Sequence, residues 1–213
     1  MVCGSLHTSG LAEMNYDIMP VFAEPLCITN IEEEFCKPLR KLKGMAQENT
    51  ENKNFNVLDK LPKVKNKLIK VFSDYINLHI LNTPEQRWQI TTSWITENTN
   101  GSQMFRHNHL NSYYSSVFYF DEVAEEHPPL ILENSLRSSG FWVSPKAPNI
   151  YSGDDFMAPM HKGCIIFFPS YIFHYHHPFV FNKIPRKSLA CNYIPIGRYG
   201  DYDSSLDTRR IHG

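Results

Sequence analysis

From Arg87 onward the chain consists of short runs of β-branched and aromatic residues, and this pattern limits the fold more than any other feature. Such runs are typical of strands. They are Arg87–Thr96, Tyr113–Phe120, Pro129–Leu132, Gly140–Val143, Gly163–Phe168, Phe173–His176 and Ser188–Ile194. Turn signals such as Asn100-Gly101 and Lys162-Gly163 separate them. Many short strands after a helical N-terminal part predict an antiparallel barrel or jelly roll with helices packed outside, a mainly β fold of the α+β class.

The N-terminal part carries the helical signals. Apolar residues recur at spacings of three and four from Val64 to Ile80, which predicts one amphipathic helix. A shorter helix is expected from Ile31, capped by Asn30, with three glutamates in its first turn and an interruption or kink at Pro38. Residues 18–28 contain two prolines and predict an edge strand.

Length and composition predict one globular domain. We assign residues 14–197 to it, with residues 1–13 as a disordered extension and residues 198–213 as a polar tail. The formal net charge of -1 gives no general attraction to nucleic acid or anionic membrane. There is no apolar run of spanning length and no signal-peptide pattern. The five cysteines are odd in number and none has CxxC spacing, which indicates a reducing compartment and favours a cytoplasmic location.

The chemically most specific residues are three histidines. His107 and His109 are two apart, so on a regular strand they would face the same side. His174 follows a long apolar run, and Arg186 comes twelve residues after it. Two close ligands, a distant third and then a cation are the layout of a non-haem iron centre with an anionic co-substrate, although imidazole suits several metals. His176 shares the parity of His174 and is the alternative third ligand.

The remaining histidines are better explained without a metal. His79 is expected on a helix face. The others are expected to be surface residues or satisfied polar groups: His7, His127, His161 and His212.

Three ordered motifs resemble one family. The stretch from Gly101 through His107-Asn108-His109 into Ser115–Phe120 is similar to the first motif of a family of 2-oxoglutarate/Fe(II)-dependent oxygenases found in bacteria and phages. The second motif is matched by Gly163, Phe168-Pro169-Ser170 and His174, and the third by Arg186, Ser188 and Asn192. The resemblance covers about residues 18–197, and three motifs in order are more specific than any one alone.

The resemblance implies a fold, cofactors and a site. The fold would be a double-stranded β-helix, the cupin-like form of the jelly roll. His107, His109 and His174 would hold Fe(II), and 2-oxoglutarate and dioxygen would be consumed to hydroxylate a small-molecule or peptide substrate, releasing succinate and CO2. The co-substrate residues would be Arg186, whose planar guanidinium suits a carboxylate, and Ser188, with Asn192, Ser115, Tyr119 and Gln103 as further candidates. Oligomeric state is left open.

Departures from the pattern leave alternatives open. Leu110 and Ser116 replace a frequent proline and glycine. His109 stands where the broader superfamily has an acid, so it is either a ligand or a supporting residue. Glu133, Asp154 and Asp155 could approach a metal, but their spacing does not place them beside His107.

Two other functions compete. One is a three-histidine cupin-type iron dioxygenase without 2-oxoglutarate, which would not require the pair Arg186 and Ser188. The other is a non-catalytic jelly-roll binding module.

Overall fold

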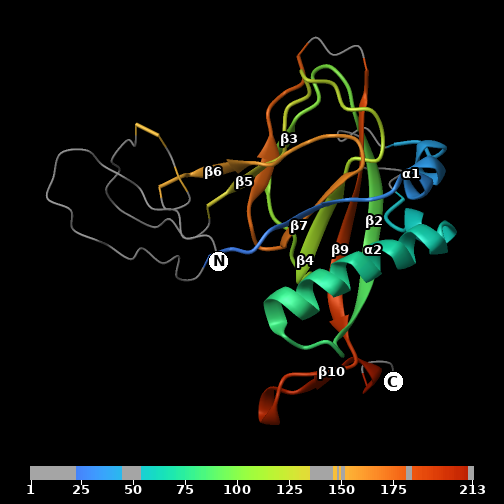
Figure 1. The fold of residues 1–213 in the computed structure, drawn as a ribbon, viewed down its shortest axis with the longest axis vertical. Coiled ribbons are helices and arrows are strands. Elements are labelled where there is room, and N and C mark those ends of the chain that lie inside the picture. Colours follow the sequence, from blue (N-terminus) through green and yellow to red (C-terminus); the bar gives the residue numbers. More distant parts are fainter. Residues whose placement is uncertain are drawn as a thin grey trace, which may run out of the picture.

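Two antiparallel sheets and a helical layer make up the fold (Figure 1). The computed structural model describes residues 23–44, 54–134, 146–147, 149, 152–180 and 184–210. The larger sheet has the order β1-β7-β4-β9-β2, with β1 Cys27–Asn30, β7 Cys164–Pro169, β4 Tyr114–Phe118, β9 Arg186–Ile196 and β2 Arg87–Asn98. The smaller sheet has the order β3-β8-β5-β6, with β3 Met104–His107, β8 His174–His176, β5 Ile131–Glu133 and β6 Asp155–Met157. This mainly β architecture with few helices confirms the predicted fold class.

Most predicted strands are present. β2, β4, β5, β7, β8 and β9 fall on predicted runs, whereas the short strands β3 and β6 were not predicted. The run Gly140–Val143 lies outside the described residues. Within the predicted tail, β10 (Arg198–Tyr199) and β11 (Leu206–Asp207) pair as a hairpin. Thr208 closes this hairpin, since its backbone N–H donates to the Gly197 carbonyl at 2.9 Å.

The long predicted helix is confirmed. α2 spans Pro62–Tyr75 and continues as a π-helical segment, Ile76–Leu81. Proline at its first position suits a helix start because that position needs no amide hydrogen bond. None of the helices in the described part of the chain is both long and apolar enough to cross a bilayer.

The start of α1 (Glu33–Arg40) differs from the prediction. Asn30 ends β1 opposite Cys164, so it cannot cap the helix, and its side chain bonds His161 Nε2 at 2.7 Å instead. The N-cap position belongs to Glu32. Pro38 does not interrupt α1, which runs two residues beyond it.

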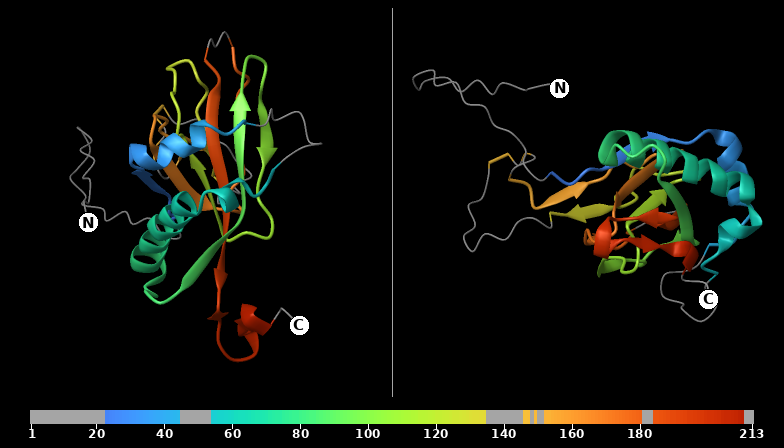
Figure 2. Two further views of the ribbon diagram at one scale, coloured as in Figure 1. Left: turned by 90° about the vertical axis from the view of Figure 1, so that its right-hand side faces the viewer. Right: turned by 90° about the horizontal axis from the view of Figure 1, so that it is seen from below.

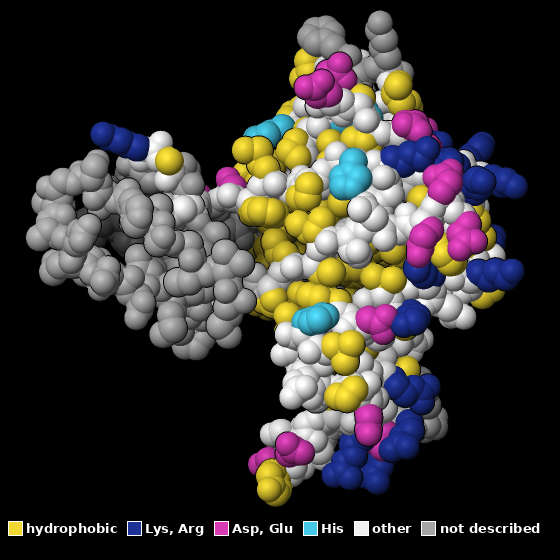
Figure 3. All heavy atoms as spheres, in the orientation of Figure 1, with side chains coloured by type: hydrophobic (Ala, Val, Ile, Leu, Met, Phe, Trp, Pro, Cys, Tyr) yellow, Lys and Arg dark blue, Asp and Glu magenta, His cyan; other side chains and the backbone are white. Residues whose placement is uncertain are grey.

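Helix α2 covers one face of the larger sheet (Figure 2). Phe72 is fully buried, and its ring packs on aromatic rings from four strands. The ring centroids lie 5.0 Å from Trp88, 5.4 Å from Tyr114, 5.5 Å from Phe167 and 4.4 Å from Tyr193. The outer side of the helical layer is charged (Figure 3), where Lys67 pairs with Glu32 at 2.8 Å. This arrangement leaves the opposite face of the sheet for a cavity.

Strand alternation divides the side chains between these two faces. On β4, Tyr114 and Phe118 join the core under α2, whereas Ser115 and Val117 face the cavity. On β9, Arg186 and Ser188 face the cavity. Arg186 and Ser188, two residues apart on β9, therefore share one face of the strand.

Phe72→Ala tests the packing of α2 on the sheet. Removing a fully buried aromatic side chain should lower the free energy of unfolding by about 3–5 kcal/mol. Urea denaturation followed by circular dichroism measures the change. Leu78→Ala, at a position 59% exposed, is the control and should change stability by less than about 0.5 kcal/mol; an equal effect of both variants would contradict the packing.

Candidate metal centre and co-substrate cavity

Three imidazoles meet between the sheets. The potential ligand atoms of His107, His109 and His174 all lie within 4.8 Å of one another. The centroids of His107 and His174 are 4.3 Å apart, and these residues are direct partners across β3 and β8. The ladder therefore brings together two residues that are far apart in the sequence.

His109 reaches the site by a different route from the predicted one. β3 ends at His107, so the alternation of side chains along a strand does not orient His109. The chain turns after the strand, and the His109 backbone N–H donates to the Ser170 carbonyl at 2.9 Å. Asn111 completes the turn with a φ of 58°, a left-handed conformation that asparagine tolerates. The prediction that the two side chains converge holds, but a turn produces the convergence.

Hydrogen bonding leaves the same ring nitrogen free on all three histidines. Nδ1 of His107 lies 2.8 Å from the Phe105 carbonyl, and Nδ1 of His174 lies 3.0 Å from the Ile172 carbonyl. A carbonyl only accepts, so Nδ1 carries the proton in both rings and Nε2 keeps its lone pair. Nδ1 of His109 lies 2.6 Å from Oδ1 of Asn192. Metal-bound histidines almost always donate their second ring N–H in this way, so the trio fits a metal.

Burial favours the neutral form of two of the three imidazoles. Desolvation, assisted by the nearby His107, lowers the pKa of His174 to about 3. Desolvation also lowers the pKa of His109. Neutral imidazole is the form that binds metals, so at neutral pH these two rings need not lose a proton first.

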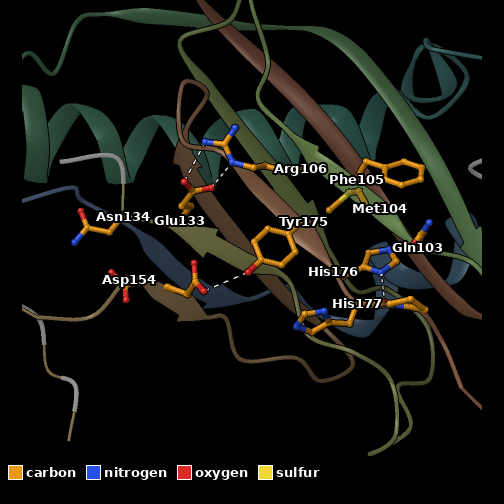
Figure 4. Close-up of a pocket in the computed structure, with 12 residues that line it drawn as sticks. Gln103, Met104, Phe105, Arg106, Glu133, Asn134, Asp154, Tyr175, His176 and His177 are labelled. Atoms are coloured by element: carbon orange, nitrogen blue, oxygen red, sulfur yellow. Dashed lines mark hydrogen bonds and ion pairs between the residues drawn. The ribbon is translucent and has the colours of Figure 1, made fainter. Parts of the chain in front are cut away.

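The converging group contains no carboxylate from the described residues. Glu133 is held by Arg106, whose Nε lies 2.5 Å away (Figure 4). Asp155 accepts a hydrogen bond from the Tyr175 hydroxyl at 3.2 Å. Asp154 lies with Glu133 and Asp155 in the lining of an outer groove. These positions agree with the expectation that the spacing of the three acids does not place them beside His107.

His176 lines the same cavity but is not part of the converging group of histidines. Its Nδ1 is 2.8 Å from the His177 carbonyl (Figure 4), and its buried Nε2 has no partner. Burial and the neighbouring Arg186 lower its pKa to about 4. The structure thus groups His174, and not His176, with the other two histidines.

One cavity of about 280 Å³ joins the trio to Arg186. Arg186 is 4% exposed and lies beside the rings of Phe179 and Tyr119, with centroids 4.9 and 5.7 Å from its Cζ. Its Nη1 donates to the Pro128 carbonyl, whereas its Nε has no partner. The ion pairs of the described residues do not include it, and burial lowers its pKa. A buried cation without a counter-charge is costly, so this end of the cavity suits an anion.

The other predicted site residues are placed as follows. Ser115, Tyr119 and Ser188 line the cavity, and the Ser188 hydroxyl lies 2.8 Å from that of Thr96. Asn192 contacts His109 instead of lining the cavity. Gln103 is a correction: it lines a neighbouring outer groove of about 500 Å³ (Figure 4) and not the cavity, although Met104 and His176 line both.

Sequence reasoning missed several cavity residues. Trp94 stacks on His109, with centroids 5.5 Å apart and an interplanar angle of 25°. Phe55 and Asn98 also line the cavity, and Oδ1 of Asn98 is buried without a partner. Alternation along β2 could have identified Trp94 and Asn98 as inward-facing, whereas Phe55 comes from a loop and carries no such signal.

His127 has structural partners on both ring nitrogens. His127 is buried; Nδ1 accepts from the Ala124 N–H at 3.1 Å, and Nε2 donates to the Ile184 carbonyl at 2.8 Å. His79 lies on the π-helical segment, as expected of a helical residue. His7 and His212 lie outside the described residues.

Comparison with known proteins finds one matching family model. Residues 92–192 match the model of the family described as "Putative 2OG-Fe(II) oxygenase". This stretch of the chain therefore resembles the 2OG-Fe(II) oxygenase family. The predicted enzyme class is therefore confirmed, and with it the cofactors of the class: Fe(II), 2-oxoglutarate and dioxygen. The occurrence of the family in bacteria and phages stays a prediction.

Solved structures share the fold at low identity. HygX from Streptomyces hygroscopicus, crystallised with nickel, 2-oxoglutarate and hygromycin B, is 10% identical over 80% of this oxygenase and 83% of its own chain, with a TM-score of 0.55. The epimerase SnoN from nogalamycin biosynthesis is 10% identical over 84% and 82%, with a TM-score of 0.57. The chain spans 56% of a Burkholderia pseudomallei oxygenase of this family, at 13% identity and a TM-score of 0.46. No relative was found among curated protein sequences.

His174→Ala should weaken Fe(II) binding at least about 100-fold, because only two imidazoles of the trio would remain. Anaerobic titration of the metal-free protein measures the affinity. His176→Gln is the matched control and should stay within about threefold of the original affinity. If the control loses the metal and His174→Ala keeps it, the ligand is His176.

Proposed function

We propose that this protein is an Fe(II)- and 2-oxoglutarate-dependent dioxygenase that hydroxylates its substrate and releases succinate and CO2. The observation that carries this proposal is the single cavity that joins three free Nε2 atoms to a buried, unpaired Arg186. A metal site alone would suit many reactions. A metal site together with a buried cation suits a co-substrate that is both a chelator and a dianion.

The histidines would hold the metal, and Arg186 the co-substrate. Fe(II) bound by His107, His109 and His174 would supply dioxygen activation at the positions that the three imidazoles leave open. Arg186 would bind the far carboxylate of 2-oxoglutarate through its free Nε–H, and Ser188 would donate a second hydrogen bond. Three neutral ligands leave the ion's charge uncompensated, which favours binding of a dianion.

Apolar side chains would keep water out of the reaction. Val117, Leu130 and Phe168 line the cavity between the polar groups, and Leu130 and Phe168 are buried. Excluding water strengthens the attraction of Arg186 for a carboxylate and protects reactive species from side reactions. The side chains thus orient the co-substrate and hold the site dry.

A small molecule is the favoured substrate. HygX was crystallised with hygromycin B, and SnoN belongs to nogalamycin biosynthesis; both resemble this chain in fold, which supports a small-molecule substrate over a peptide. We also propose a cytoplasmic location, because Cys27, Cys36, Cys164 and Cys191 are free thiols.

The second candidate is an iron dioxygenase that does not use 2-oxoglutarate. The all-histidine ligand group favours it, because such a group is expected in three-histidine cupins. Arg186 argues against it, because a dioxygenase that does not bind 2-oxoglutarate does not require a buried cation in the cavity. The family resemblance likewise argues against a non-catalytic binding module.

Anaerobic addition of Fe(II) and then 2-oxoglutarate should produce a metal-to-ligand charge-transfer band, since the keto acid chelates the ion. Admitting oxygen should then yield succinate. The band and the succinate yield are measured by absorption spectroscopy and chromatography. Oxygen uptake with a substrate and without 2-oxoglutarate would favour the second candidate, and absence of any band would refute the proposal.

Arg186→Met separates stability from co-substrate binding. Replacing a buried unpaired cation by an apolar side chain of similar length should leave the unliganded protein at least as stable, within about 1 kcal/mol. The variant should bind Fe(II) normally but require at least about 100-fold more 2-oxoglutarate, a loss of roughly 3 kcal/mol. Urea denaturation and isothermal titration calorimetry measure the two effects; an unchanged 2-oxoglutarate affinity would remove Arg186 from the site.

A further inference from the structure

We propose that Asn192 is a positioning residue that makes His109 able to bind the metal by determining which ring nitrogen of His109 carries the proton. The proposal rests on the metal site proposed above. Oδ1 of Asn192 lies 2.6 Å from Nδ1 of His109. With the proton on Nδ1, the lone pair of Nε2 is free for the ion.

His109 differs from the other two ligands in how its proton is placed. His107 and His174 each bond the carbonyl two residues earlier, so local backbone fixes their protonated nitrogen. His109 follows the turn after β3 and instead meets a side chain on β9, 83 residues away. The position of the proton on the His109 ring therefore depends on tertiary structure and on the amide group of Asn192.

An amide can present either end to the ring. Were Nδ2 of Asn192 to face His109, it would donate to Nδ1, the proton would move to Nε2, and the ring could no longer bind a metal. Nδ2 lies 2.9 Å from the Thr92 hydroxyl, and Oδ1 lies 2.9 Å from the Ser115 hydroxyl. Nδ2 donates to the Thr92 hydroxyl and Oδ1 accepts from the Ser115 hydroxyl, so both ends of the amide are bonded while Oδ1 faces the ring. The observed orientation, with Oδ1 toward the ring, is the one that allows metal binding.

His109 and Asn192 are thus a matched pair. A carboxylate ligand at position 109 would have no ring nitrogen to protonate, and it would not need Asn192 as a hydrogen-bond acceptor. An imidazole there needs it, because a misplaced proton on Nε2 would block the ion. Asn192 therefore acts through His109 alone and touches neither the metal nor the cavity.

Metal affinity in three variants tests the pairing. Anaerobic titration with Fe(II) should show that Asn192→Ala weakens binding about 10- to 100-fold, as loss of a partner to a metal-bound histidine typically does. Asn192→Asp should stay within about threefold of the original affinity, because a carboxylate accepts the same hydrogen bond. In a His109→Ala background, Asn192→Ala should cause no further change.

A control and a metal-free measurement distinguish the alternatives. Asn77→Ala removes another buried amide, which bonds Trp88 Nε1 at 2.8 Å, and should leave metal affinity unchanged. Nitrogen-15 NMR of the metal-free protein should show His109 protonated on Nδ1 in the original protein and in Asn192→Asp.

Several outcomes would overturn the inference. Protonation of His109 on Nε2 in the metal-free protein would do so, as would an Asn192→Asp variant that binds as poorly as Asn192→Ala. An additional loss in the His109→Ala background would show that Asn192 does not act through His109. Failure of the original protein to bind Fe(II) would instead refute the proposed function, and the NMR result would still be decisive for the proton position.

Discussion

The alternation of side chains across the larger sheet is the constraint on which the rest of the structure depends. Successive residues of β4, β7 and β9 point to opposite faces, so one face can be apolar and the other functional. The apolar face packs on α2 around Phe72. The other face carries Ser115, Arg186 and Ser188 into the cavity. A shift of one residue in any of these strands would exchange the two sets and destroy core and site together.

The cavity can bind a ligand because the fold leaves several of its polar groups without hydrogen-bond partners. Arg186 is buried with one N–H unused, and the three histidines each direct a free lone pair inward. Burying such groups lowers stability unless a ligand completes them. The core under α2 offsets this cost, since its buried aromatic rings contribute without any ligand. Stability and function thus come from opposite faces of the same sheet.

Much of this could be predicted from the sequence, and the failures share a cause. The long helix and the longer strands have strong periodicity and were predicted; β3 and β6 are too short to show any. Local preference predicts Asn30 as a helix cap, but in the structure Asn30 is the last residue of β1 and pairs with β7. Gln103 shares a motif with the ligands yet lies outside the cavity. In each case the local pattern does not encode how the segment lies against distant parts of the chain.

The sequence by itself predicted the fold class and the resemblance to the oxygenase family, and it singled out His107, His109, Arg186 and either His174 or His176, because these depend on residue types in a fixed order. Only the tertiary structure decided that His174 and not His176 joins the trio, and that a turn and not a strand aims His109. It also placed Asn192 against His109 and not in the cavity lining. The physical reason is that hydrogen bonds between residues as distant as His109 and Asn192 exist only after the sheets have formed, and no local spacing encodes them.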